Sequence, residues 1–148
     1  MSGKTIRVEL SQRNDYRFDI AFGDAMPVLT SDEPAPLGAG LGPSPVQMLC
    51  AAVGNCLSDS LLFAFRKFKQ EPSPIQCAVT AEVGRNGDNR LRVLYMSAQI
   101  RMGVLAASLE QVDHVLAQFE EFCTVTQSVR QGIPITVEVF DSAGQQLK

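Results

Sequence analysis

The most reactive side chains in this sequence are four cysteines, Cys50, Cys56, Cys77 and Cys123. Cys56 lies in the middle of a long apolar stretch, beside polar residues that are costly to bury unless they line a cleft or find partners. Cys123 immediately precedes Thr124, where a helix is predicted to begin, and the backbone N–H groups of a helix N-terminus favour a thiolate. We therefore regard Cys56 and Cys123 as candidate nucleophiles, and we expect Cys50 and Cys77 to be small buried hydrophobes.

Other kinds of site find little support in the sequence. There is no Cys-x-x-Cys motif and His114 is the only histidine, so neither a zinc site nor a Ser-His-Asp triad is predicted. The glycine-rich stretch at residues 38–42 lacks the Lys-Ser/Thr of a phosphate-binding loop. We expect no metal and no cofactor.

The composition is that of one globular domain over residues 1–148, with 45% hydrophobic and 20% charged residues. The net charge of −3, from 13 Lys and Arg against 16 Asp and Glu, does not favour nucleic-acid binding. The first residues lack the apolar region of a secretion signal. We therefore expect a cytoplasmic protein whose cysteines are thiols.

The sequence pattern predicts short strands followed by a loop in the N-terminal part of the chain. Alternating apolar residues predict a half-buried strand from Ile6, a turn at residues 13–15 and a second strand over residues 16–22. A third short strand is predicted at Val28 and Leu29. Four prolines and three glycines make residues 32–45 a loop.

A long helix follows, with Ser44 as N-cap, Pro45 in the first turn and Gln47 completing a capping box. The pattern continues to Lys69, and the N-terminal two-thirds of the helix is apolar nearly all round, which predicts burial on most sides. The charge of Asp59 indicates a buried helix of a soluble protein rather than a membrane span.

Small residues repeat every fourth position on this helix, at Cys50, Gly54 and Ser58. One chain has little material with which to surround such a helix, so we predict a homodimer in which two copies pack their long helices together. The alternative is a monomer whose own sheet and second helix cover it.

The C-terminal half alternates strands and helices. Residues 75–83 and 91–102 predict a hairpin, and residues 108–111 and 124–127 each fit a capping box ahead of a helix. Alternation at Ile135, Val137 and Val139 predicts a last strand. The order β-β-(β)-α-β-β-α-α-β is typical of an α+β fold.

Two stretches carry a family resemblance. Residues 42–57 read Gly-Pro-Ser-Pro-Val-Gln-Met-Leu-Cys-Ala-Ala-Val-Gly-Asn-Cys-Leu, which resembles the central-helix signature Pro-x-(Glu)-x-Leu-x-x-Ala-x-x-x-Cys of the OsmC/Ohr family of osmotically inducible and organic hydroperoxide resistance proteins. Residues 122–134 resemble the second motif of that family, Cys-Pro-Val-Ser followed by a basic residue and Gly. The element order matches too, so the resemblance covers nearly the whole chain.

The resemblance implies an OsmC-like fold in an intertwined homodimer with two active sites at the interface. It also implies a peroxidase of the antioxidant stress response, in which Cys56 attacks an organic hydroperoxide, lipid or alkyl, and becomes a sulfenic acid. Cys123 then resolves the sulfenic acid as a disulfide, and an external thiol or dithiol reductant restores both thiols.

The sequence departs from the family at three places. Family peroxidases carry a Glu ten residues before the first Cys, where it orients an activating Arg, and that position is Val46 here. Arg13 is the best match to the activating Arg, with Arg17 as runner-up, and the Pro of the second motif is Thr124. These differences place the chain closer to an uncharacterised OsmC-like branch.

Two functions follow from these observations. The favoured one is a peroxidase that uses Cys56 and Cys123, because packing alone does not explain two cysteines at the motif positions. The alternative is a protein with little turnover that binds a small apolar ligand at the dimer interface, which the missing Glu favours.

Overall fold

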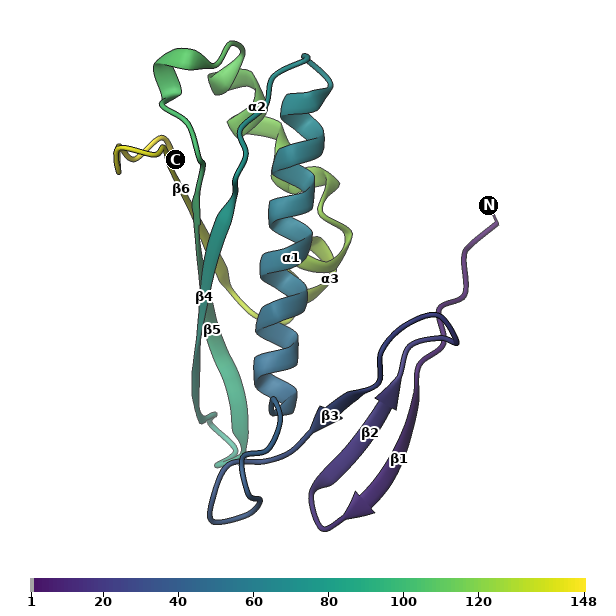
Figure 1. Ribbon diagram of the computed structural model, residues 1–148. Coiled ribbons are helices and arrows are strands. Elements are labelled where there is room, and N and C mark those ends of the chain that lie inside the picture. Colours follow the sequence, from purple (N-terminus) through teal and green to yellow (C-terminus); the bar gives the residue numbers. More distant parts are fainter. Residues whose placement is uncertain (1) are drawn as a thin grey trace. The chain divides into compact units, whose positions relative to one another are not determined.

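The computed structural model describes residues 2–148. The chain divides into two compact units, with the boundary along the sequence between residues 48 and 49. The first unit holds strands β1 (Glu9–Asn14), β2 (Arg17–Ala21) and β3 (Leu29–Ser31), and helix α1 (Pro45–Arg66) begins at its end (Figure 1). The second unit holds most of α1 and the elements that follow it: β4 (Gln76–Arg85), β5 (Leu91–Arg101), η1 (Ala106–Ser108), α2 (Val112–Gln118), η2 (Phe119–Phe122), α3 (Thr124–Arg130) and β6 (Ile135–Phe140).

This order confirms the predicted α+β class and the predicted sequence of strands and helices. The two short 3₁₀ helices, η1 and η2, are additions that the sequence pattern did not predict. The prediction of one domain over residues 1–148 stays a prediction.

The first unit is an antiparallel sheet in the order β1-β2-β3. Leu10 pairs with Ile20 across the first two strands, and Phe18 pairs with Ser31 across the second and third. The prediction of a half-buried first strand is wrong: every residue of β1 is exposed in this chain, because no layer of the unit packs on either of its faces.

Buried Asp32 organises the loop that follows β3. Its carboxylate accepts hydrogen bonds from the backbone N–H groups of Glu33, Ala39 and Leu41, at 2.8, 3.2 and 3.2 Å. Gly38 is required for this arrangement, because a Cβ there would lie 2.3 Å from the Asp32 carboxylate. The proline- and glycine-rich segment is therefore an ordered loop built around one acidic side chain.

Helix α1 begins as predicted. The Ser44 N–H donates to Gln47 Oε1 at 2.9 Å, and the Gln47 N–H donates to Ser44 Oγ at 3.3 Å, which is a capping box. The helix ends at Arg66 rather than Lys69, because Lys69 adopts the left-handed conformation with φ of 58° that terminates helices.

The burial of α1 is one-sided, which corrects the prediction of burial on most sides. A stripe of four apolar residues, each four positions after the last, has no exposed surface: Val53, Leu57, Leu61 and Phe65. By length and composition α1 could cross a membrane. Its buried stripe instead packs within the core of the chain, as expected for a soluble fold.

The small-residue stripe of α1 faces strand β4 of the same chain. A Cβ on Gly54 would lie 2.8 Å from Val79 Cγ2 and 3.3 Å from Cys77 Sγ. Cys50 and Ser58 are partly exposed, so the interpretation of this stripe as the contact with a second long helix stays a prediction. Glycine at this position lets the strand approach the helix closely.

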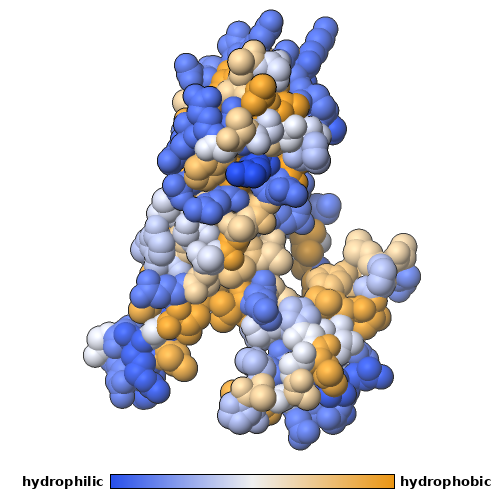
Figure 2. All heavy atoms as spheres, turned by 60° about the vertical axis from the view of Figure 1, so that its left-hand side comes forward, coloured by the Kyte–Doolittle hydropathy of each residue, from blue (hydrophilic) through white to orange (hydrophobic). Residues whose placement is uncertain are grey.

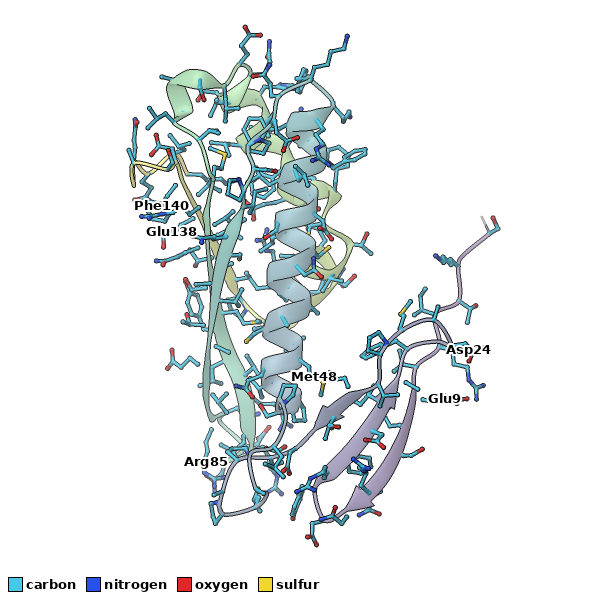
Figure 3. The ribbon with its side chains drawn as sticks, in the orientation of Figure 1. Glu9, Asp24, Met48, Arg85, Glu138 and Phe140 are labelled. Carbon is cyan, nitrogen blue, oxygen red and sulfur yellow. The ribbon has the colours of Figure 1, made fainter. Side chains whose placement is uncertain are left out.

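The second sheet has the order β4-β5-β6, with β4 antiparallel and β6 parallel to β5. Its inner face is apolar and packs on α1, α2 and η2 through Met96, Ala98, Ile100, Val137 and Val139. Glu138 and Phe140 lie on the other face, turned away from α1 (Figure 3), and Gln99 donates to Glu138 at 3.1 Å. The sheet is half buried, as the alternation in β6 predicted.

Neither of the two later capping boxes forms. Helix α2 begins after Gln111, which is in the left-handed conformation and makes no side-chain cap. Helix α3 has Cys123 as its N-cap, also without a side-chain cap, and Gln127 instead donates to the Glu120 carbonyl at 2.9 Å. Tertiary contacts replace the local caps in this region.

We predict that Gly54→Ala destabilises the protein although alanine is the better helix former. The alanine gains about 1 kcal/mol of helix propensity, but its Cβ must displace Val79, and such overpacking costs about 1–3 kcal/mol. Chemical denaturation should show a net loss of about 1 kcal/mol. In a Val79→Ala background the same change should be neutral or stabilising, and an equal loss in both backgrounds would contradict this account.

Candidate active site

Cys56 lies at the edge of the buried face of α1. It directly precedes the fully buried Leu57 and is itself half buried, while Asn55 on its other side is exposed. The thiol is therefore in contact with the protein core and also reachable from solvent. Partial exposure is a property that a reacting thiol needs.

Cys123 lies at the junction of η2 and α3 and is fully buried. Its thiol donates a hydrogen bond to Thr126 Oγ1 at 3.0 Å, and its carbonyl accepts from the Gln127 N–H at 2.9 Å. Thr126 is also fully buried. The first turn of α3 thus fixes the position of the Cys123 sulfur.

The structure brings Cys56 and Cys123 together. The pKa of the Cys123 thiol is raised, first by burial and second by the adjacent Cys56 side chain, although Thr126 acts in the opposite direction. All four cysteines are free, so both are thiols here. The sequence analysis placed a thiolate at Cys123 on account of the helix N-terminus, and that expectation is wrong because burial outweighs the seven-residue helix.

Cys50 and Cys77 lie apart from this pair, on a groove of about 350 Å³ between α1 and β4. Burial raises the pKa of both thiols, against a smaller opposing effect of Ser58 on Cys77. They behave as the small, partly buried hydrophobes that the sequence predicted.

The polar residues around Cys56 are accommodated on the helix surface. Asn55 donates to Asp59 at 3.1 Å and Ser58 donates to the Gly54 carbonyl at 2.8 Å. They have local partners, so their presence in the apolar stretch does not by itself require a cleft.

Glu120, three residues before Cys123, forms ion pairs with two basic residues that the sequence analysis did not identify. Arg130 donates to Glu120 Oε1 at 2.7 Å, and Lys148 lies 2.5 Å from Oε2. Burial opposes ionisation, but these two partners outweigh it and hold the pKa of Glu120 below its usual range. The spacing of Cys123 and Thr126 could have revealed their bond, but nothing in the sequence links Glu120 to Lys148.

The two candidate arginines belong to the first unit and differ in how firmly they are held. Arg13 is 56% exposed and pairs with Asp19 at 3.4 Å. Arg17 is 25% exposed and pairs at 3.8 Å with Asp32, which is 2% exposed. Burial opposes the Asp32 charge, yet three backbone N–H groups and Arg17 hold its pKa below the usual range. Val46 supplies no carboxylate, so Asp32 is the acidic partner of Arg17.

Comparison with known proteins now identifies the family. The model of the OsmC-like protein family matches residues 38–138, and the chain belongs to that family. Both cysteines of the site fall inside the matched range.

Solved structures share the fold across nearly the whole chain. An OsmC-like protein of unknown function from Vibrio cholerae has a TM-score of 0.79 at 14% identity, covering 93% of this chain and 100% of its own. The organic hydroperoxide resistance protein OhrB of Bacillus subtilis has a TM-score of 0.71 at 17% identity, with coverage of 92% and 98%. An OsmC-like protein from Mycoplasma pneumoniae has a TM-score of 0.77 at 13% identity, with coverage of 95% and 99%. Identities this low establish the fold alone, and a search of curated proteins gives no match.

We predict that Glu120→Gln lowers the free energy of unfolding by about 1–3 kcal/mol at neutral pH, because Arg130 and Lys148 lose their charged partner. A carboxyl with a lowered pKa stabilises the folded state above its unfolded pKa and ceases to do so as pH falls through its folded pKa. The difference between wild type and variant should therefore vanish in acid. Denaturation of the exposed neighbour variant Glu121→Gln should match wild type within about 0.5 kcal/mol, and equal losses in both variants would contradict the assignment.

Proposed function

We propose that this protein is a thiol-dependent peroxidase that reduces organic hydroperoxides, with Cys56 as the attacking thiol and Cys123 as the resolving thiol. One observation carries the proposal: the half-buried Cys56 lies beside the fully buried Cys123. A sulfenic acid–disulfide cycle requires an accessible thiol that attacks the peroxide. It also requires a second thiol close enough to form the disulfide.

The chemistry proceeds in three balanced steps. The Cys56 thiolate attacks the terminal oxygen of the hydroperoxide, the S–O bond forms as the O–O bond breaks, and the alkoxide takes a proton and leaves as an alcohol. The Cys123 sulfur then attacks the sulfenic acid, forming the disulfide and releasing water. An external dithiol, or two thiols, supplies two electrons and two protons that restore both cysteines.

The environment of Cys123 suits the resolving role. Its raised pKa keeps it neutral at pH 7, so it does not place a second negative charge beside the Cys56 thiolate. Its hydrogen bond to Thr126 holds the sulfur in place until Cys56 is oxidised.

Names within the family agree with the proposal at a coarse level, since OhrB of Bacillus subtilis is an organic hydroperoxide resistance protein. A second candidate, the binding of a small apolar ligand with little turnover, is favoured by one observation: Val46 occupies the position where family peroxidases carry a Glu. Turnover measurements separate the two functions.

We also propose that the protein is a cytoplasmic homodimer. Support for the dimer comes from apolar side chains that reach the surface of both units (Figure 2). In the first unit Ile20 is the one buried hydrophobic residue among residues 2–48, whereas Ile6, Leu10, Met26 and Val28 are each more than half exposed. Surfaces of this kind mark interfaces between chains.

Replacement of each cysteine by serine tests the proposed cycle. Cys56→Ser should abolish the consumption of cumene hydroperoxide in the presence of a dithiol, because no thiol remains to attack the peroxide. Cys123→Ser should allow a single turnover, after which Cys56 proceeds to sulfinic acid because nothing resolves it.

Cys50→Ser and Cys77→Ser are the matched controls and should keep full activity. Turnover that survives the loss of Cys56, or that depends on Cys50 or Cys77, would contradict the proposal. Absence of turnover in the wild-type protein would leave ligand binding as the function.

We further propose that the cation that favours the Cys56 thiolate comes from the β1–β2 hairpin. The sequence analysis named Arg13, and this stays a prediction. The ion pair with buried Asp32 makes Arg17 the stronger candidate, because a fixed guanidinium loses less entropy than an exposed one when it orients toward an anion.

Alkylation of Cys56 at neutral pH, followed site by site by mass spectrometry, distinguishes the two arginines. Arg17→Ala should slow alkylation, because the variant lacks the guanidinium charge that favours the thiolate. Arg13→Ala should have a smaller effect. The reverse order would restore Arg13 as the activating residue, and unchanged rates in both variants would exclude the hairpin as the source of the cation.

A further inference from the structure

Cys123 lies in a bend of the chain that one acidic residue holds closed. The Cys123 N–H donates to the Glu120 carbonyl at 3.1 Å, and the Gln127 side chain donates to the same carbonyl at 2.9 Å. The Glu120 carboxylate accepts from Arg130 of α3 at 2.7 Å. Glu120 therefore links the residues before Cys123 to those after it, and residues 120–130 are called here the Cys123 corner.

Lys148 connects the Cys123 corner to the core sheet. Its Nζ lies 2.5 Å from Glu120 Oε2, donates to the Leu116 carbonyl at 2.7 Å and is 5.3 Å from the centroid of the Phe119 ring. The carbonyl of Lys148 accepts from the Val139 N–H of β6 at 3.1 Å. Because Val139 is fully buried, the backbone of Lys148 is fixed to the core while its ammonium group is fixed to the corner.

The ion pair between Lys148 and Glu120 is partly buried, and the Glu120 side chain is only 13% exposed. A partly buried pair is screened less by salt than an exposed one, and its charge-assisted hydrogen bonds hold a defined geometry. These contacts reach Cys123 through the backbone of Glu120. Lys148 can therefore act on the position of the Cys123 sulfur through another residue.

The position of that sulfur matters because the sulfenic acid on Cys56 has two possible reactions. In resolution the Cys123 sulfur attacks it: the S–S bond forms, the S–O bond breaks, and the leaving hydroxide takes the Cys123 proton to become water. In overoxidation a second hydroperoxide attacks instead: a second S–O bond forms, the O–O bond breaks, and an alcohol leaves behind a sulfinic acid. Resolution needs the two cysteines at disulfide distance, whereas overoxidation does not.

We propose that Lys148 is a positioning residue for the resolving step, and that its ion pair with Glu120 holds Cys123 beside Cys56 and so protects Cys56 from overoxidation. This inference rests on the proposed peroxidase function and concerns the resistance of the same site to excess hydroperoxide. Lys148 controls the fate of the sulfenic acid and not the rate at which it forms.

The experiment measures the concentration of cumene hydroperoxide at which half of Cys56 becomes sulfinic acid during turnover with a dithiol. Mass spectrometry of the full-length protein gives this value. Lys148→Leu removes the ammonium group and should lower the concentration several-fold, because slower resolution leaves the sulfenic acid open to a second hydroperoxide for longer. The rate at which the first equivalent of hydroperoxide is consumed without dithiol should match wild type.

Three further variants show whether the ion pair is responsible. Lys148→Arg keeps the charge and should match wild type, as should Arg66→Leu, which removes the exposed ion pair of Arg66 with Glu71. Glu120→Gln should lower the concentration as Lys148→Leu does. The double variant should lower it little further, because the two residues act through one contact.

An unchanged concentration in Lys148→Leu would overturn the inference, and so would an equal fall in Lys148→Arg or in Arg66→Leu. A higher concentration in Lys148→Leu would overturn it as well, because it would mean that the Cys123 corner has to be released before resolution. A wild-type protein that forms no disulfide between Cys56 and Cys123 would instead refute the proposed function.

Discussion

The packing of α1 against the β4-β5-β6 sheet is the constraint on which the rest of the structure depends. Its stripe of buried residues repeats every fourth position, from Val53 to Phe65, so the helix fits the apolar face of the sheet in one rotation about its axis. That rotation leaves Cys56 at the edge of the buried face. Cys123 belongs to the same core, and a shift of one residue along α1 would turn Cys56 by about 100° away from it. The thiol pair is thus a consequence of core packing.

The same packing gives the two cysteines different chemical environments. Cys56 keeps access to solvent because the neighbouring face of α1 is exposed, whereas Cys123 is enclosed, bonded to Thr126 and kept neutral by burial. The ion pairs of Glu120 with Arg130 and Lys148 hold the segment around Cys123 in place. This difference supports the proposed division of roles, with Cys56 as the attacking thiol and Cys123 as the resolving thiol.

Sequence patterns predicted the helices and strands more accurately than the tertiary contacts around them. Ser44 and Gln47 specify the start of α1 because a capping box involves neighbours in the chain, and alternation specified β6 because its face is covered by the same chain. The small residue Gly54 indicated a close approach but not the identity of the neighbour, which within this chain is Val79. Burial of Cys123 and the partner of Glu120 depend on contacts between distant segments, and no local pattern encodes them. The polar neighbours of Cys56 and the predicted helix start after Cys123 already singled out these two cysteines, and the family motifs strengthened the choice.

Peptide mapping of the protein after treatment with one equivalent of an organic hydroperoxide tests the central claim most directly. The account predicts a single intramolecular disulfide between Cys56 and Cys123 that a dithiol reverses, while Cys50 and Cys77 remain free. Recovery of Cys56 as a free thiol, with oxidation found at Cys50 or Cys77 instead, would contradict it.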